Sequence, residues 1–197
     1  MILALWRGRT MPDRTMNETL DALGQAFMEE LDEIVRVGHT RYMGYRPEDL
    51  VELDVRAQSA CTYCHMLSEA DRRLIDRDGI RPLEIKGGLK VWLVESANVV
   101  IRLKKMDEDG KTRNYPTKQA LAYDAQRELP DLPMPPDRLT AGYWLDATGQ
   151  IINRVQIARP NGRRLPTWCA AIVPREERKA GERIWVDVTR QKRFRGV

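Results

Sequence analysis

The sequence predicts an α+β fold in which an N-terminal antiparallel helical hairpin packs on a C-terminal antiparallel β-sheet, a meander. Helical periodicity is confined to residues 17–79, and short β-rich runs follow from residue 80 without alternating strands and helices. A chain of 197 residues, 42% of them hydrophobic, can bury a core of its own. We therefore expect a single domain over residues 17–189, preceded by a disordered extension, residues 1–16, and followed by a basic tail, residues 190–197.

The first helix is predicted over residues 17–37. Asn17 is a residue type that caps helix N-termini, and Gly38 is placed to end the helix in a left-handed backbone conformation. The apolar residues recur at steps of three or four and therefore line one helix face: Leu20, Leu23, Phe27, Leu31 and Ile34.

A second, longer helix is predicted from Pro47, a residue favoured at the first helical position, to residue 78. Its apolar positions follow a heptad spacing, which predicts packing against the first helix as a hairpin. Ser68 begins a Ser-Glu-Ala-Asp string that is typical of a capping box, so we also expect a kink at which the helix restarts. The predicted seam consists of Leu50, Leu53, Ala57, Ala60, Cys64, Leu67, Asp71 and Leu74.

The β-rich part of the chain has three sections. A mixed section, residues 80–128, contains two short β runs and a helical stretch. A proline-rich connector, residues 129–137, separates it from the predicted antiparallel meander, residues 138–189. Turn signals such as Asn161-Gly162 lie between the runs. The expected strands cover 91–94, 99–103, 139–145, 151–158, 164–173 and 183–188, and the helical stretch covers 118–127.

Positive charge is concentrated in the last quarter of the chain. Residues 154–197 contain twelve Lys or Arg and four Asp or Glu, whereas residues 1–78 contain ten and fifteen. Such a basic segment attracts a polyanion such as nucleic acid, because neutralised phosphates release counterions. The alternatives are a solvated basic face and a docking surface for an acidic protein. We expect the nucleic-acid contacts to come from Arg154, Arg159, Arg163, Arg164, Arg190, Lys192, Arg193 and Arg195.

Three tryptophans fall in this part of the chain: Trp144, Trp168 and Trp185. On a sheet face, aromatic rings and arginines can stack on bases and clamp a nucleic-acid strand. The same rings can equally form the core beneath the helices. The sequence leaves both interpretations open.

Cys61 and Cys64 have the CxxC spacing of metal-binding thiolates, and His65 completes the CxxCH string that attaches c-type haem. Haem attachment belongs to exported proteins, and the sequence begins without an export signal. Zinc is the alternative, with further ligands needed from Cys169, His39 or His65. We expect no metal here, since two small thiols on a packed helix explain the spacing.

Glu84 and Lys86 form one half of a metal-dependent nuclease site, in which a strand presents a carboxylate to Mg²⁺ and an ammonium group to the phosphate. The other half, an upstream Asp on a neighbouring strand, is missing from the sequence. The alternative interpretation is a solvated strand edge.

Together these patterns predict a small cytoplasmic, non-enzymatic regulatory or accessory protein of bacterial type that needs no cofactor and contacts nucleic acid through its basic C-terminal part. Three cysteines without an export signal favour a reducing compartment. We expect no membrane association, and a protein partner or a second copy bound through the helical hairpin. A metal-dependent nuclease or phosphodiesterase using Glu84 and Lys86, and a pure protein–protein interaction module, are the alternatives.

Overall fold

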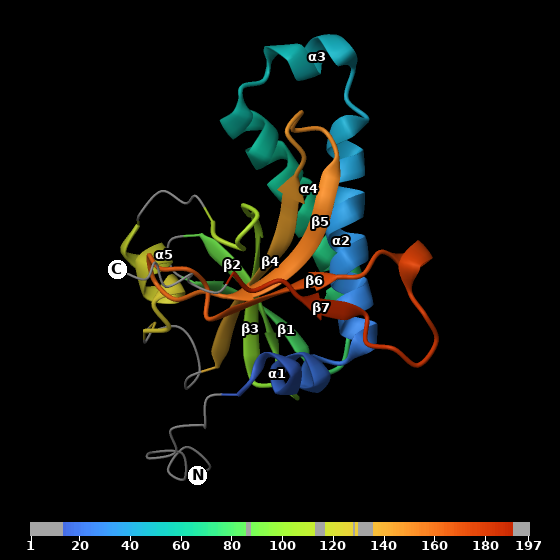
Figure 1. Cartoon of the computed structure of the whole chain (residues 1–197). Coiled ribbons are helices and arrows are strands. Elements are labelled where there is room, and N and C mark those ends of the chain that lie inside the picture. The colour runs from blue at the N-terminus through green and yellow to red at the C-terminus, as the bar shows by residue number, and fades with distance from the viewer. Residues whose placement is uncertain (1–13, 86–87, 113–116, 128, 130–135, 191–197) are drawn as a thin grey trace, which may run out of the picture.

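The computed structural model describes residues 14–85, 88–112, 117–127, 129 and 136–190. It confirms the α+β prediction, with helices in the N-terminal half and a sheet in the C-terminal half (Figure 1). The helices are α1 (Met16–Leu23), α2 (Gln25–Met43), α3 (Pro47–Glu52), α4 (Val55–Leu74) and α5 (Lys118–Asp124), with a 3₁₀ turn η1 (Arg175–Glu177). The strands are β1 (Ile80–Ile85), β2 (Leu89–Val94), β3 (Val99–Lys105), β4 (Asp137–Leu145), β5 (Ile152–Arg159), β6 (Trp168–Ile172) and β7 (Trp185–Asp187).

In the described part of the chain, the seven strands form one sheet in sequence order from β1 to β7. From β4 to β7, each strand pairs antiparallel with the strand that follows it, which confirms the predicted meander. Strands β3 and β4 pair in parallel, and α5 lies on the connection between them. The expectation that strands and helices do not alternate is therefore wrong at this one place, because a parallel pair requires a crossover connection.

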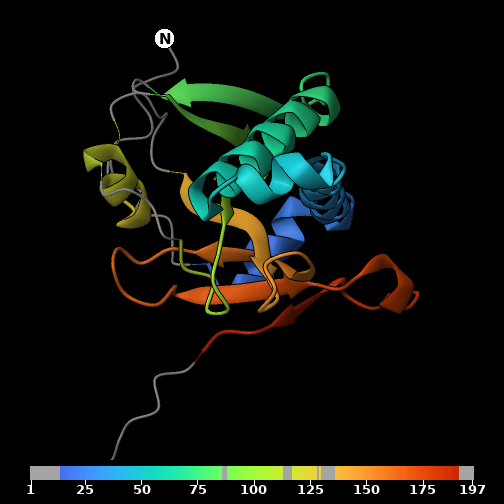
Figure 2. The same ribbon diagram turned by 90° about the horizontal axis from the view of Figure 1, so that it is seen from above.

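The helical hairpin covers one face of the sheet. Helices α2 and α4 lie side by side, and their apolar residues join those of the sheet in one core (Figures 1 and 2). All five apolar residues predicted to line the first helix belong to it. On the other face, Tyr123 of α5 packs over Val91 and Val100. Alternate residues of β2 and β3 thus enter two different cores, as the two-residue period of a strand requires.

The first predicted helix is in fact two. The chain turns at Gly24, whose φ of +82° is strained for any other residue, and α2 then continues to Met43. The prediction that Gly38 ends a helix is wrong, because Gly38 is buried inside α2. The start of the first helix lies close to the prediction, since Thr15 caps α1 through a reciprocal pair of hydrogen bonds with Glu18.

The second predicted helix is also divided. Pro47 begins α3 as predicted, but a new helix starts after Asp54, whose carboxylate accepts hydrogen bonds from the N–H groups of Arg56 and Ala57. Ser68 lies within α4, so the predicted restart there is wrong. The predicted seam is correct only in part: Leu74 is buried in the core and Leu67 packs against it, whereas Ala60 and Cys64 are exposed. The buried residues of α4 are Thr62, Met66, Glu69, Ala70 and Leu74.

Several expectations fall outside the part of the chain that the structure describes. They concern most of the N-terminal extension, the basic tail beyond Arg190 and most of the proline-rich connector. The helical stretch predicted at 118–127 begins as predicted but ends at Asp124, as α5. Thr117 caps it by accepting a hydrogen bond from the N–H group of Ala120 at 3.1 Å.

Candidate functional site

The structure separates the arginines that were predicted to bind nucleic acid. Arg159 forms an ion pair with Asp137 at 3.0 Å, and Arg190 forms one with Asp109 at 3.1 Å. Arg154 lies over the ring of Trp144, with 4.9 Å between its Cζ and the ring centroid. These contacts are made within the protein, so the three arginines form no common patch of unpaired charge.

The tryptophans divide in the same way. Trp168 and Trp185 are buried in the core beneath the helices. The indole N–H of Trp185 donates a hydrogen bond to the side-chain oxygen of Asn17 at 3.2 Å. Trp144 is half-buried under Arg154. The three rings therefore do not form a common stacking face, because two of them are buried in the core.

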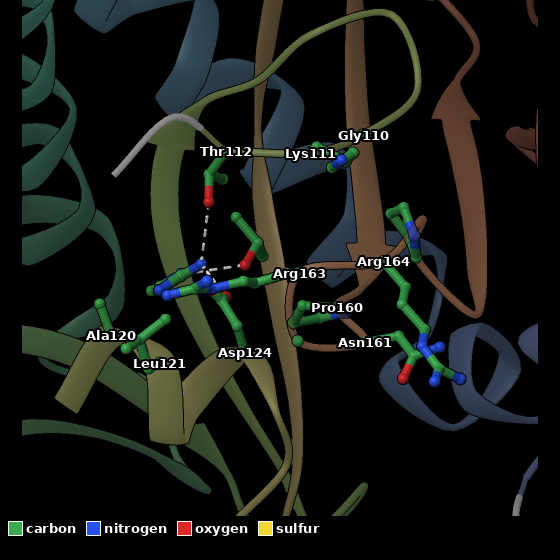
Figure 3. Close-up of a pocket in the computed structure, with 14 residues that line it drawn as sticks. Gly110, Lys111, Thr112, Ala120, Leu121, Asp124, Pro160, Asn161, Arg163 and Arg164 are labelled. Atoms are coloured by element: carbon green, nitrogen blue, oxygen red, sulfur yellow. Dashed lines mark hydrogen bonds and ion pairs between the residues drawn. The ribbon is translucent and has the colours of Figure 1, made fainter. Parts of the chain in front are cut away.

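Two of the predicted arginines, Arg163 and Arg164, are exposed and line a cavity of about 230 Å³ (Figure 3). The cavity lies between α5, the segment 110–112 that follows β3, and the loop 160–166 that joins β5 to β6. Residues of β3 and β4 close it from below. Lys192, Arg193 and Arg195 lie outside the described residues.

Arg102 of β3 forms the floor of this cavity, although its side chain is only 1% exposed. Its Nε donates a hydrogen bond to Oγ1 of Thr140 at 3.0 Å. Its Nη2 donates to Oγ1 of Thr112 at 3.2 Å and to the carboxylate of Asp124. Tyr123 supports the guanidinium group from one side, with 4.5 Å from Cζ to the ring centroid.

These contacts hold the guanidinium group of Arg102 in place but leave one nitrogen unused. Nη1 of Arg102 is buried and has no hydrogen-bond partner among the described residues. A buried donor on a charged group is costly when it stays unpaired. Arg102 is also one of the residues that line the cavity.

Asp124 is the one carboxylate among the described lining residues. Burial raises its pKa, while the charge of Arg102 and the hydrogen bond from it act in the opposite direction. The backbone oxygen of Asp124 also accepts a hydrogen bond from the N–H group of Gly162 at 2.6 Å. This bond connects the loop 160–166 to α5, so the two walls of the cavity are fixed relative to each other.

Three cationic side chains surround the opening: Lys111, Arg163 and Arg164. None of them makes an ion pair with another described residue. In Figure 3, Arg163 extends toward the side of the cavity where Thr112 and Asp124 lie, whereas Arg164 points the other way. With Arg102 included, the described lining carries four positive groups and one carboxylate, a net positive charge that attracts anions.

The structure does not bring the proposed metal ligands together. Cys61 and Cys64 are free thiols on α4, half-buried and exposed respectively. The ring of His65 shares a hydrogen bond with the hydroxyl group of Tyr45, with 2.8 Å between Nε2 and Oη. Cys169 lies on β6 and is buried in a small cluster with Met106. Burial raises the pKa of the Cys169 thiol to about 12. The described residues include no group of three or more His, Cys, Asp or Glu side chains placed to hold a metal ion.

The nuclease alternative stays a prediction. Glu84 is exposed on β1, opposite Lys90 of β2, and Lys86 lies outside the described residues. The geometry between the two proposed groups is therefore not defined.

The centre of the cavity, Arg102 with its partners Thr140 and Asp124, was not predicted from the sequence. One signal was present, because Arg102 interrupts the apolar run at 99–103 with a charge. The string Gly110-Lys111-Thr112 forms one wall of the cavity. The parallel pairing of β3 with β4 places Arg102 directly opposite Thr140.

Comparisons with protein-family models, with curated proteins and with solved structures gave no match to this chain. Among the described helices, none has the length and apolar character needed to cross a membrane. The function is therefore argued from the chemistry of the cavity.

Proposed function

We propose that this protein is a non-enzymatic accessory protein that binds single-stranded DNA or RNA and holds phosphate groups of the strand in the cavity between α5 and the β5–β6 loop. One observation carries the proposal: a buried arginine, Arg102, whose Nη1 has no hydrogen-bond partner among the described residues, lines a cavity together with three cations that form no ion pair with those residues. Arginine binds phosphate through charge-assisted hydrogen bonds, which supply the missing acceptor.

A single strand fits this geometry better than a duplex does. The cationic groups lie in and around a recess rather than on a flat or convex surface. A flexible strand can turn its backbone into such a recess, whereas a duplex holds its phosphates on a rigid cylinder. The unpaired thiols of Cys61, Cys64 and Cys169 support a reducing location, and we propose the cytoplasm.

The test is binding of fluorescently labelled single-stranded DNA, single-stranded RNA and duplex DNA, measured by anisotropy across a salt series. We expect single strands to bind and the affinity to fall steeply with salt. The double variant Arg163→Ala/Arg164→Ala should bind at least about tenfold more weakly and show a shallower salt dependence.

Arg56→Ala and Arg175→Ala are matched controls, because both arginines are exposed and lie outside the cavity. We expect both controls to bind like the unmodified protein. If single strands do not bind even at low salt, or if the cavity and control variants lose affinity equally, the proposal is wrong.

A protein partner or a second copy is a second candidate, and a different region favours it. Val51 of α3 is 86% exposed and Ile151, in the turn between β4 and β5, is 65% exposed. The two segments meet at one end of the molecule, where residues of both line a cavity of about 270 Å³ that includes Tyr42 and Leu50 (Figure 1). Exposed apolar side chains around a recess are typical of protein-binding surfaces.

This candidate is tested by the oligomeric state over a concentration series, measured by light scattering. Val51→Glu should prevent self-association, whereas Ile75→Glu should not, since Ile75 is also exposed but follows the C-terminal end of α4. A monomer at all concentrations would leave only a foreign protein as the partner.

A further inference from the structure

We infer that the Arg102 cavity recognises a terminal phosphate group, a phosphomonoester dianion, rather than a phosphodiester in the interior of a strand. This inference rests on the proposed function in one respect, the use of the same cavity. Nη1 of Arg102, which has no hydrogen-bond partner among the described residues, belongs to a side chain that is 1% exposed and that binds Thr140 of β4 and Asp124 of α5.

An interior phosphodiester carries a sugar on each side. To bring its oxygens to a buried floor, the strand would have to enter and leave the recess with both sugars beside the phosphate. A terminal phosphate has one sugar only, so it can be inserted end-on. The cavity is bounded on two sides by α5 and by the loop 160–166. A hydrogen bond of 2.6 Å from the N–H group of Gly162 to the backbone oxygen of Asp124 joins these two sides.

The charge of the cavity matches the charge of a monoester. The described lining residues carry four cationic groups and one carboxylate. A phosphodiester has a single negative charge, whereas a phosphomonoester carries about −1.5 to −2 at pH 7 and has three strong acceptor oxygens. Arg102, Lys111 and Arg163 all line the cavity, so a phosphate group with three acceptor oxygens can accept hydrogen bonds from more than one of them.

The lining also explains why the base is not held in the cavity. Among the described lining residues there is no aromatic side chain. The nearby ring of Tyr123 is covered by Arg102, and its hydroxyl group donates to the backbone oxygens of Val100 and Leu139. A base therefore finds no ring to stack on in this part of the cavity, and recognition is expected to be independent of base identity.

The experiment compares oligonucleotides of one sequence that carry a 5′-phosphate, a 3′-phosphate or hydroxyl groups at both ends. We expect at least one phosphorylated probe to bind about tenfold more tightly than the hydroxyl probe, and the two phosphorylated probes show which strand end is used. A nucleoside monophosphate should compete with the bound probe, whereas the nucleoside should not. Equal affinity for all three oligonucleotides overturns the inference and leaves the proposed function standing.

The two conclusions can also fail in the opposite order. If no oligonucleotide binds but the nucleoside monophosphate does, as measured by calorimetry, the terminal-phosphate site is supported and the proposed strand-binding function is wrong. If neither class of probe binds, both are wrong.

Variants locate the effect. Arg102→Gln should reduce the ratio of affinities for phosphorylated and hydroxyl probes to about one, because it removes the charged donor on the floor. Since Arg102 is buried, circular dichroism must show that this variant is folded. Should it fail to fold, Arg163→Gln and Lys111→Gln carry the test and should lower the ratio by at least about threefold, whereas Arg175→Gln should not. An unchanged ratio in folded cavity variants overturns the inference.

Discussion

The backbone of Gly38 in α2 lies directly against Met66 in α4. A Cβ atom added to Gly38 would stand 2.5 Å from Cγ of Met66 and 2.8 Å from its backbone nitrogen. The two helices thus approach each other as closely as their backbones allow at this point. This approach sets which face of α4 is buried, and Met66 occupies the centre of that face.

Gly38→Ala should destabilise the protein by about 2 kcal/mol, because the clash with the Met66 backbone outweighs the gain of about 1 kcal/mol from the higher helix propensity of alanine. The free energy of unfolding in urea measures this. Gly44→Ala is the control, since a Cβ at Gly44 would come no closer than 3.4 Å to a neighbouring atom and its φ is −79°. A stabilised Gly38→Ala protein would show that the helices can separate without cost.

Gly142→Ala should be more damaging. A Cβ at Gly142 would stand 1.6 Å from the backbone oxygen of Lys104, its partner in the parallel pair of β3 and β4. That backbone cannot move without breaking the ladder that also positions Arg102 opposite Thr140. We expect a loss of more than about 3 kcal/mol in unfolding free energy. Unchanged thermal stability would contradict the parallel pairing.

Glu69 should make stability depend on pH in acid. Its side chain is fully buried, and hydrogen bonds from Arg72 and Arg73 lower its pKa from 4.5 to about 2. Because the pKa is lower in the folded state, this contribution is present above pH 4.5 and is lost as the pH falls toward 2. Glu69→Gln should cost about 2–4 kcal/mol at pH 7 and flatten the unfolding free energy over this range. If the unfolding free energy of Glu69→Gln still falls with pH in this range, another carboxylate causes the dependence.

Arg178 holds the segment between β6 and β7 against α2. It forms an ion pair with the buried carboxylate of Asp32 at 2.9 Å and donates a hydrogen bond to the backbone oxygen of Val173, also at 2.9 Å. Burial raises the pKa of Asp32, so the loss of one cationic partner is costly there. Arg178→Ala should lower the unfolding free energy by about 1–3 kcal/mol. Arg175→Ala, on the exposed turn η1, should change it by less than about 0.5 kcal/mol.

The preference for a terminal phosphate should rise with pH. A phosphomonoester loses its second proton near pH 6, so the affinity ratio of phosphorylated to hydroxyl probes should increase between about pH 5.5 and 7.5. Asp124, whose pKa is raised by burial, faces the same cavity, as do the cations Lys111, Arg163 and Arg164. Protonation of Asp124 changes the affinity for both probes, so it leaves the ratio of the two affinities unchanged. A change in the ratio with pH therefore reports the second ionisation of the phosphate. A ratio that stays constant with pH would indicate that the site does not sense the second charge.

Local patterns predicted the parts of the fold that depend on neighbours in the chain. The steps of three and four between Leu20 and Ile34 placed these residues in the core, and Pro47 was predicted correctly as a helix start. The β runs of the meander were also recovered, because their alternation and turn residues are local signals. Gly38 was misjudged for the opposite reason, since its role depends on Met66, which lies on another helix.

The candidate site was predicted only in part. Arg163 and Arg164 were chosen for their charge, and the structure places both at the cavity, whereas Arg154, Arg159 and Arg190 make contacts within the protein. Charge density in a sequence does not reveal which arginines find an internal partner. That depends on residues brought close by folding, such as Asp137 for Arg159.

The sequence by itself determined the α+β class, the order of helices and strands, and the basic character of the C-terminal part, because each follows from composition and from the period of apolar residues. The tertiary structure decided the cavity. Arg102, Asp124 and Arg163 are far apart in the chain, and they meet only because β3 pairs in parallel with β4 and α5 crosses between them. The period of apolar residues along the chain indicates which residues are buried, whereas the order and pairing of the strands determine which residues they contact.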